Sequence, residues 1–465
     1  MSLFSPAQTY TPPPTPFGGF IDGVPAQTAP HLLVSGPSGV GKSRRVLAPG
    51  ILMWRGPVVA VSSKPDLVDL CLEQRLEWGG HGRTYVLDLS GEVPDEVLPD
   101  GVRKVVVDPT ALIRSDDDAL DLASILMQSG AAGAGGGTGK AGGDAFWENV
   151  STAPLAAILR ATGGDGIAWT REAVSRIAPE DEGDEDQPCW ANAVGRLEES
   201  SPMLSAELVS AAALDGKMRD SIMVTMKSAV APWLRSTVVG SRGALPFTPD
   251  LLDHPAATLF MVAPATGVAA GAAVSAVDFI SKRWRANQTE AVKLPRLLLV
   301  VDELCNTMPW PKLPTVVTES RAMGIHLLVA VQATSQFAKR YGTDGMNELR
   351  EVFPATLLLV GAPEKEMLEK AAWWFGQSER QKVATDHLGH QSMSSERADT
   401  LTATDLLPRS KSEGRLLRGS RPGATGDGIN EAGLLVQLVD ISQIPFRADP
   451  QPQNARRRAF AKARG

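Results

Sequence analysis

The stretch that decides the fold spans residues 32–43 and reads Leu32-Leu33-Val34-Ser35-Gly36-Pro37-Ser38-Gly39-Val40-Gly41-Lys42-Ser43. An apolar segment runs directly into the spacing G-x-x-x-x-G-K-S, which is the pattern of a phosphate-binding loop between a strand and a helix. Glycine lets the backbone turn so that successive N–H groups face a phosphate, and the following helix N-terminus adds partial positive charge. The sequence therefore predicts nucleotide binding by the following residues: Gly36, Pro37, Ser38, Gly39, Val40, Gly41, Lys42, Ser43 and Arg44.

A second segment supplies the acidic residues that such a loop requires. Lys42 is expected to contact the β- and γ-phosphates of ATP, and the Ser43 hydroxyl to ligate Mg²⁺. Asp302 and Glu303 directly follow the apolar run 297–301, and ligands of open α/β sheets bind at the carboxyl ends of strands. We expect Asp302 to hold Mg²⁺ through its water shell and Glu303 to polarise the attacking water. The alternative for this acidic pair is a helix cap.

Two further residues fit the chemistry of phosphoryl transfer. Arg321 precedes the apolar run 325–331, and Gln332 ends it. An arginine supplied by a neighbouring subunit neutralises charge on the transferred phosphoryl group, and a glutamine at a strand end can sense the γ-phosphate. The alternatives are a surface arginine on a helix and a polar strand terminus.

The composition describes a folded chain rather than a disordered one. Of the 465 residues, 43% are hydrophobic and 21% are charged, as in ordinary globular proteins. The net charge of −7 argues against a nucleic-acid binder that works by bulk positive charge. It leaves open a ring whose pore alone is basic, because only the local field matters there.

The order of apolar and helical segments predicts an α/β protein with a mostly parallel sheet that is interrupted by an all-α domain. Near-continuous apolar strands between helical stretches indicate a parallel sheet covered on both faces. The expected strands are 32–35, 58–62, 84–87, 104–107, 258–262, 297–301, 326–331 and 355–360. The expected helices between them are 119–126, 146–160, 171–177, 190–197, 205–214 and 219–234.

These segments divide the chain into five parts. They are a Pro-rich extended arm at 1–30, a nucleotide-binding domain in two parts at 31–112 and 246–450, an inserted all-α domain at 113–245, and a basic tail at 451–465. The Gly/Ala-rich stretch 131–143 and the acidic stretch 180–186 are expected to be solvated loops. The uncharged stretch 256–277 is interpreted as a buried strand and a core helix, and the alternative is a membrane span.

Together, these motifs resemble the coupling-protein ATPases of type IV secretion and bacterial conjugation, over about residues 31–445. The segment Ser62-Ser63-Lys64-Pro65-Asp66 is similar to the family's Asp-Pro-Lys-Gly-Glu/Asp, with Ser62 in place of the leading acid. Phe146-Trp147 resembles the opening of the family's all-α domain. The longest match is the series Leu299-Val300-Val301-Asp302-Glu303, Leu313-Pro314, Arg321, Gly324, Gln332, Ser335-Gln336 and Tyr341-Gly342.

The resemblance implies a RecA-like, DNA-stimulated ATPase that assembles as a homo-hexameric ring and uses ATP and Mg²⁺. It would bring a relaxase–single-stranded DNA complex to the components of a type IV secretion channel, with the all-α domain recruiting the substrate. Arg321 falls at the family's trans-acting arginine, and Gln332 at its nucleotide-sensing glutamine.

The resemblance also implies a place in the cytoplasm, at the inner face of the cell membrane. Members of the family usually begin with two membrane-spanning helices, and the sequence shows none. The chain is therefore a soluble variant, or a partner supplies the membrane contact, or the N-terminus is missing.

Two other functions stay open. One is a related ring motor of the septal DNA-pump or type VII secretion kind, which is disfavoured because one all-α insertion splits one motor core. The other is a nucleotide-gated receptor that docks protein substrates and hydrolyses little. The intact Lys42, Asp302 and Glu303 argue against this second alternative.

Overall fold

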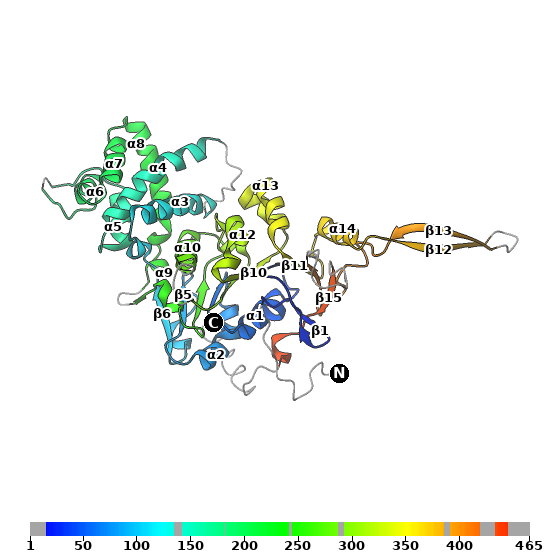
Figure 1. Ribbon diagram of the computed structural model, residues 1–465. Coiled ribbons are helices and arrows are strands. Elements are labelled where there is room, and N and C mark those ends of the chain that lie inside the picture. The colour runs from blue at the N-terminus through cyan, green and yellow to red at the C-terminus, as the bar shows by residue number, and fades with distance from the viewer. Residues whose placement is uncertain are drawn as a thin grey trace.

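One large sheet forms the centre of the structure, and helices cover both of its faces (Figure 1). The computed structural model describes residues 15–133, 142–181, 183–240, 244–286, 293–385, 391–418 and 433–444. The sheet has 13 strands in the order β2-β1-β15-β14-β11-β3-β10-β9-β4-β8-β5-β6-β7. From β11 to β7 all neighbours pair in parallel, whereas the pairs from β11 to β2 are antiparallel.

The parallel strands lie where the apolar runs predicted them, with ends that differ by at most two residues. They are β3 His31–Ser35, β4 Val58–Ser62, β5 Thr84–Asp88, β6 Val102–Val106, β8 Thr258–Val262, β9 Leu297–Val301, β10 Ile325–Val331 and β11 Ala355–Leu359. The two-residue strand β7 Leu245–Pro246 was not predicted. The α/β class with a mostly parallel sheet is therefore confirmed.

Alternate residues of each strand pack into two separate cores, because successive side chains of a strand point to opposite faces. Leu32 and Val34 join the core that holds α1 Ala48–Met53 and α2 Asp66–Gly79. Leu33 joins the core on the other face. The helices of that face are α10 Ala270–Ala286, α11 Leu304–Thr307, α12 Leu313–Met323 and α13 Gln336–Val352.

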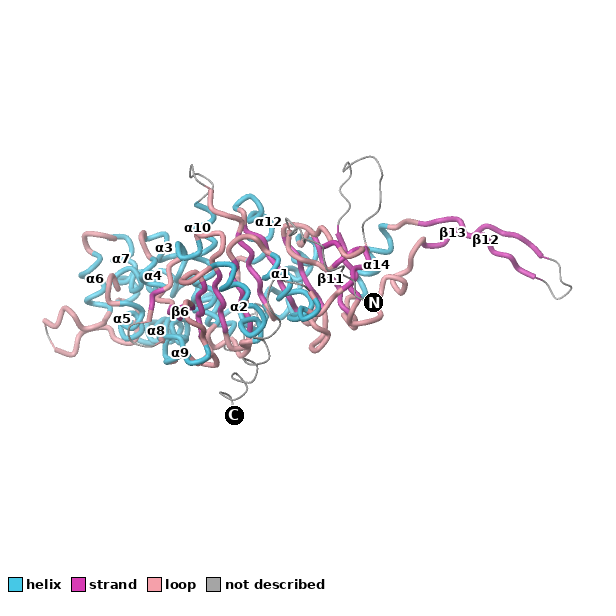
Figure 2. Tube along the Cα trace, turned by 90° about the horizontal axis from the view of Figure 1, so that it is seen from below, coloured by secondary structure: helices cyan, strands magenta, loops and turns pink. Residues whose placement is uncertain are grey.

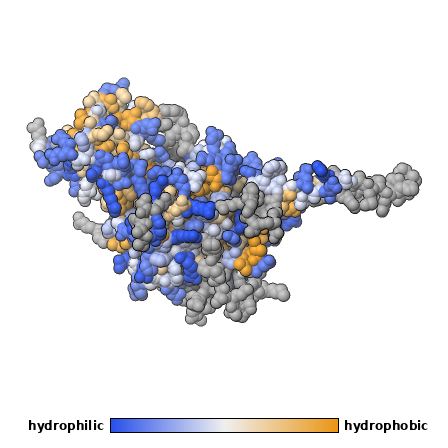
Figure 3. Space-filling model, in the orientation of Figure 1, coloured by the Kyte–Doolittle hydropathy of each residue, from blue (hydrophilic) through white to orange (hydrophobic). Residues whose placement is uncertain are grey.

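A helical region lies at one end of the sheet (Figures 1 and 2). It contains α3 Asp116–Gly133, α4 Gly142–Ala161, α5 Gly166–Ala173, α6 Trp190–Leu197, α7 Pro202–Ala212, α8 Gly216–Val230 and α9 Ser236–Val239. Figure 3 shows apolar colour over this end, where the side chains of Met203, Val209 and Val224 are exposed.

Two predictions in the helical region need correction. α5 begins and ends earlier than the predicted segment 171–177, because Asp108, distant in sequence, accepts a hydrogen bond of 2.9 Å from the backbone N–H of Ile167. The predicted loop 131–143 is too long, since α3 extends to Gly133 and α4 begins at Gly142. The intervening residues 134–141 lie outside the described part of the chain.

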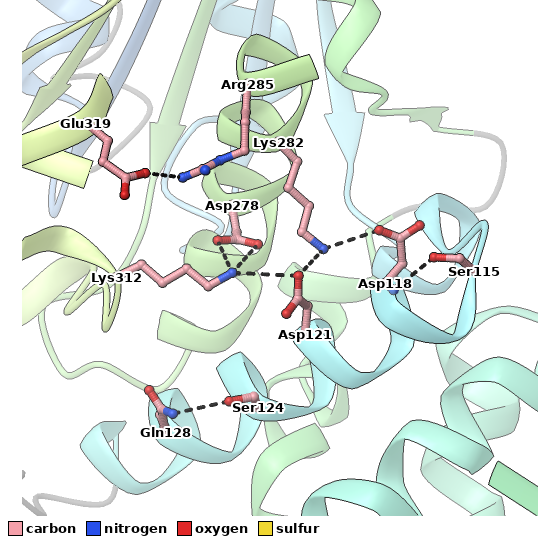
Figure 4. A network of polar contacts seen from close by, with 10 residues as sticks. All are labelled: Ser115, Asp118, Asp121, Ser124, Gln128, Asp278, Lys282, Arg285, Lys312 and Glu319. Carbon is pink, nitrogen blue, oxygen red and sulfur yellow. Dashed lines mark hydrogen bonds and ion pairs between the residues drawn. The ribbon is translucent and has the colours of Figure 1, made fainter. Parts of the chain in front are cut away.

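Ion pairs join the helical region to the sheet's helices (Figure 4). Lys282 of α10 lies 3.3 Å from the Asp118 carboxylate and 2.9 Å from that of Asp121, both on α3. Lys312, directly before α12, lies 3.2 Å from Asp278 of α10 and 4.0 Å from Asp121. Burial raises the pKa of Asp278 despite the opposing charge of Lys312. Lys282 therefore links α3 to α10, and Lys312 links α3 to the start of α12.

The stretch 256–277 forms a strand and part of a helix of the core, as predicted. It contains β8 and the first half of α10, and most of the residues in both elements are buried. Among the described helices, none combines the length and the apolar character needed to cross a bilayer.

The antiparallel edge of the sheet comes from both ends of the described chain. Outward from β11, the strands of this edge are β14 Glu413–Arg418, β15 Leu434–Gln437, β1 Phe20–Ile21 and β2 Val24–Pro25. The prediction of an arm without core elements at 1–30 is wrong for this part, because Phe17 and Phe20 are each 1% exposed. Residues 1–14 and the predicted basic tail 451–465 lie outside the described residues.

A long hairpin extends from the end of the sheet opposite the helical region (Figures 1 and 2). Its strands are β12 Gln377–Thr385 and β13 Gln391–Asp399, which follow α14 Lys365–Trp374. Short 3₁₀ turns complete the chain at Asp95–Val97, Pro109–Leu112, Ala231–Leu234, Pro249–Leu252 and Ile441–Gln443.

A buried arginine fastens α2 to the strand starts at the edge opposite the phosphate-loop motif. Arg75 is 1% exposed and donates to Thr258 Oγ1 at 2.7 Å. Its guanidinium also donates to the carbonyl oxygens of Trp54 and Gly56, each at 3.0 Å, and of Ala257 at 3.2 Å. Removal of the guanidinium would take the donor away from the carbonyl oxygens of Trp54 and Gly56, whereas that of Ala257 would keep the Val58 N–H at 3.0 Å.

We therefore expect Arg75→Met to lower the free energy of unfolding by about 3 kcal/mol or more, because buried acceptors would be left without donors. Urea unfolding followed by tryptophan fluorescence measures the change. Arg55→Met is the matched control, since Arg55 is exposed and its guanidinium lies over the same Trp78 ring. Equal stability of the two variants would contradict the structural role of Arg75.

Candidate nucleotide-binding site

The strand order brings the predicted site residues to one edge of the sheet. β10 lies between β3 and β9, and both of its pairings are parallel. The segment 36–43 follows β3, Gln332 follows β10, and Asp302 with Glu303 follows β9. Because the carboxyl ends of parallel strands share one edge, segments separated by more than two hundred residues in sequence meet there.

The loop after β3 has the backbone of a phosphate cradle. Gly39 and Gly41 have φ values of +79° and +104°, which side chains rarely allow. A side chain at Gly36 would place its Cβ 2.8 Å from the Cβ of Leu359. A π-helical turn, Ser43–Leu47, follows the loop and leads into α1. Backbone conformation therefore requires glycine at positions 39 and 41, and lack of space requires it at position 36.

Lys42 lies folded into this loop. Its ammonium group donates to the carbonyl oxygen of Gly36 at 2.7 Å and to that of Pro37 at 3.1 Å. Burial lowers the pKa of Lys42, and the negative charges of Asp302 and Glu303 oppose that shift. Two carbonyl oxygens of the loop and the negative charges of Asp302 and Glu303 thus hold the ammonium group of Lys42 at the loop.

Ser43 and Asp302 are in direct contact. The Ser43 hydroxyl donates to Asp302 Oδ2 at 3.0 Å. The other carboxylate oxygen, Oδ1, is buried and has no hydrogen-bond partner among the described residues. Buried acceptors are nearly always satisfied in proteins, so this oxygen needs a donor such as a metal-bound water. A hydroxyl beside a carboxylate with a free oxygen fits Mg²⁺ held partly through water.

The electrostatic surroundings of Asp302 depend on an acid that the sequence analysis did not place in the site. Burial and, next, the negative charge of Asp66 raise the pKa of Asp302 to about 6, although Ser43 and Lys42 oppose the shift. Asp66 Oδ1 accepts a hydrogen bond of 2.9 Å from the Ser62 hydroxyl. Asp66, in the first turn of α2, therefore supplies a carboxylate beside Ser62.

Glu303 has an unusual backbone. Its φ of +52° lies in the left-handed region, and among the described residues only Asp22 shares this feature without being glycine. Such a conformation costs about 1–3 kcal/mol and persists only where the surrounding structure holds it in place. The Thr307 hydroxyl donates to the carbonyl oxygens of Asp302 and Glu303, at 2.9 and 3.1 Å. The sharp turn brings both acidic side chains into contact with the site, each through a different partner.

Gln332 is the partner of Glu303. Its side-chain amide donates to Glu303 Oε1 at 3.1 Å, and its backbone N–H donates to Gln336 Oε1 at 3.1 Å. The Gln-x-x-x-Gln spacing therefore closes a small loop that holds the first glutamine beside the acid. The Gln332 side chain can therefore respond to a ligand that lies between Glu303 and the phosphate loop.

The structure does not bring Arg321 to the phosphate loop of its own chain. Arg321 is exposed on α12, directly before β10, whereas Gln332 follows the other end of that strand. The length of the strand separates the two residues by roughly 20 Å. Burial lowers the pKa of His31 to about 3, and the charges of His326 and Arg321 contribute to the shift. Arg321 therefore lies near the start of β3, not its end.

Arg44 is also held away from the loop. Its Nε donates to Asp440 Oδ2 at 2.8 Å, and its Nη2 donates to Oδ1 at 2.6 Å. This paired contact holds the pKa of Asp440 far below its usual range. The neighbouring Arg45 donates to the Leu438 carbonyl oxygen at 2.8 Å. Both arginines thus fasten the first helical turn to the C-terminal segment 438–444, a contact that no local motif indicates.

Comparisons with known proteins find a family match in part of the chain and similar folds over most of it. Residues 296–412 match the family described as the TraM recognition site of TraD and TraG. No curated protein matches the chain in a sequence comparison.

Solved structures match over nearly the whole chain. The unbound monoclinic form of the bacterial conjugative coupling protein TrwBΔN70 has a TM-score of 0.62 at 19% identity, covering 95% of this chain and 92% of that chain. TrwB in complex with the ATP analogue ADPNP gives 0.59 at 19% identity, with 90% and 88% covered. TrwB in complex with ADP and Mg²⁺ gives 0.58 at 18% identity, with 94% and 90% covered. Residues 296–412 therefore match this family region, and the chain as a whole shares the RecA-like P-loop fold of TrwB.

Proposed function

We propose that this chain is an ATP-hydrolysing coupling protein that recruits a relaxase–single-stranded DNA complex and drives DNA transfer through a type IV secretion or conjugation channel. The observation that carries the proposal is the pair of contacts at one sheet edge, Ser43 to Asp302 and Gln332 to Glu303. The complexes of TrwB with ADPNP and with ADP and Mg²⁺ support it.

In this proposal, each residue of the site has a different role in ATP hydrolysis. The backbone of 36–43 and the Lys42 ammonium bind the phosphates. Ser43 and Asp302 would hold Mg²⁺, which when bound neutralises charge on the phosphate oxygens. Glu303 accepts the proton as water attacks the γ-phosphorus and the bond to ADP breaks. Gln332 orients Glu303 and senses the γ-phosphate.

The partners follow from the family. The description of the matched region as a TraM recognition site supports contact with relaxosome proteins. The distance between Arg321 and its own phosphate loop supports a homo-hexamer in which each subunit supplies Arg321 to its neighbour. In this proposal the protein works at the inner face of the cell membrane, with membrane contact through a partner.

Turnover should depend on Glu303 and Lys42 in different ways. We expect Glu303→Gln to lower ATP turnover by about 10²–10⁴-fold, because the general base is lost, and to retain ATP binding. Lys42→Ala should lose both turnover and tight binding. A phosphate-release assay with and without single-stranded DNA measures turnover. Glu198→Gln, at an exposed residue of the helical region, is the matched control, and persistent turnover in Glu303→Gln would contradict the assignment.

Magnesium-dependent binding should weaken as the pH falls toward 6. The pKa of Asp302 is raised to about 6, so this carboxyl becomes protonated near that pH and no longer attracts Mg²⁺. Asp66→Asn removes a negative neighbour, lowers the pKa of Asp302 and moves the loss of binding to lower pH. Titration with a fluorescent non-hydrolysable ATP analogue and Mg²⁺, from pH 7.5 to 5, measures the midpoint. Asp69→Asn, exposed on the same helix, should leave the midpoint unchanged.

Arg321 should act between subunits. Arg321→Ala should lower DNA-stimulated turnover by about 10³–10⁵-fold, the usual effect of such an arginine, and retain nucleotide binding. Mixing this variant with Lys42→Ala should restore part of the turnover, because one subunit then supplies the site and the other the arginine. Arg285→Ala is the control at another exposed arginine. Full turnover of Arg321→Ala alone would remove the assignment.

A further inference from the structure

A buried carboxylate joins three strand ends beside the nucleotide site. Glu364 is 2% exposed, and its Oε1 accepts a hydrogen bond of 2.6 Å from the Ser35 hydroxyl. The same oxygen accepts the backbone N–H of Thr334 at 2.7 Å, and Oε2 accepts the Thr334 hydroxyl at 2.5 Å. Ser35 and Thr334 are both fully buried, so these contacts take place away from water.

The donors to Glu364 border the two loops of the proposed site. Ser35 is the last residue of β3 and directly precedes Gly36. Thr334 lies two residues after Gln332, inside the loop that Gln336 closes. Glu364 follows β11, and the strand order β11-β3-β10 places the three strand ends next to one another. Glu364 therefore bridges the phosphate loop and the Gln332 loop, next to the backbone hydrogen bond of 3.2 Å from the Gly36 N–H to the Val331 carbonyl oxygen.

An arginine balances the charge of this carboxylate. Arg350 of α13 donates from Nε to Thr334 Oγ1 at 2.7 Å, and its Nη2 lies 3.7 Å from Glu364 Oε2. A third contact, 2.8 Å from Nη1 to Glu366 Oε2, faces solvent, because the Glu366 side chain is 79% exposed. A buried carboxylate is tolerated when it is paired and fully hydrogen-bonded, and Glu364 meets both conditions.

We propose that Glu364 is a positioning residue for ATP hydrolysis, and that it acts through Gln332 on Glu303. The inference rests on the proposed ATPase function. Glu364 holds both the backbone N–H and the hydroxyl of Thr334, so the loop that begins at Gln332 has a fixed place relative to the phosphate loop. Without this anchor, Gln332 keeps its chemistry but not its place against Glu303.

The substitution Glu364→Gln changes this anchor with little change in shape. An amide has one acceptor oxygen, which can still receive the Ser35 hydroxyl and the Thr334 N–H. Its NH₂ group then faces the Thr334 hydroxyl and the Arg350 guanidinium, which are donors to Glu364 Oε2 or lie close to it. The NH₂ group cannot accept the Thr334 O–H, so the hydroxyl proton must turn to another acceptor, and the negative charge that faces Arg350 is lost.

The first measurement is the division of the effect between kcat and binding. We expect Glu364→Gln to lower kcat by roughly 10–100-fold, because small displacements of catalytic groups cost up to this much. The Kd for a non-hydrolysable ATP analogue should stay within about 3-fold, as for a group that acts only on the transition state. Glu366→Gln is the matched control, since it removes an acidic partner of the same Arg350 at the surface.

The second measurement separates positioning from general stability. If Glu364 acts through Gln332, then Glu364→Gln should lower kcat further by less than about 2-fold in a Gln332→Ala background, because coupled residues are not additive. Effects that multiply independently would overturn the positioning role. Thr334→Val removes the hydroxyl contacts with Glu364 and Arg350 and keeps the backbone N–H contact with Glu364. It should also lower kcat by roughly 10-fold, and it decides the matter if Glu364→Gln does not fold.

The two proposals fail in different ways. Normal wild-type turnover together with unchanged kcat in Glu364→Gln or Thr334→Val would overturn the positioning role and leave the ATPase proposal standing. Wild-type protein that binds ATP but hydrolyses none, with or without single-stranded DNA, would overturn both. An equal loss of kcat in Glu366→Gln would assign the effect to Arg350 rather than to the anchor.

Discussion

The structure depends on the parallel pairing of β10 with both β3 and β9. This pairing brings the phosphate-loop motif, Gln332 and the Asp302-Glu303 pair to one edge, although they come from three distant parts of the chain. Each face of the three strands is buried, so a shift of register by one residue would exchange the two cores. The site is therefore fixed by the same apolar contacts that hold the sheet together.

Much of the fold could be predicted from local sequence, and the reasons are physical. β9 is a run of five apolar residues between Arg296 and Asp302, so its ends are marked by charge, and they were predicted to the residue. The contacts of Ser43 with Asp302 and of Gln332 with Glu303 link residues that the motifs had already indicated. Their roles in hydrolysis stay predictions.

Contacts between distant segments could not be predicted. Glu364 and Asp440 are ordinary acids in sequence, and only the folded chain brings them to Thr334 and Arg44. The edge strand β14 was not predicted because its apolar residues are only Leu416 and Leu417, whereas β15 was not predicted although it has the apolar run Leu434-Leu435-Val436. Glu303 shows the same limit, since its left-handed backbone is imposed by hydrogen bonds around α11 and not by residue type.

The edge of the sheet has a consequence for synthesis on the ribosome. β1 begins at Phe20 and pairs with β15 at Gln437. The first described strand therefore cannot pair with β15 until almost the whole chain has been synthesised. β3 likewise lacks both neighbours until residues 325–359 have been translated. Contacts of such long sequence separation slow folding and leave apolar strands exposed meanwhile. The nascent chain therefore has a long interval in which β3 is not covered by its neighbours in the sheet.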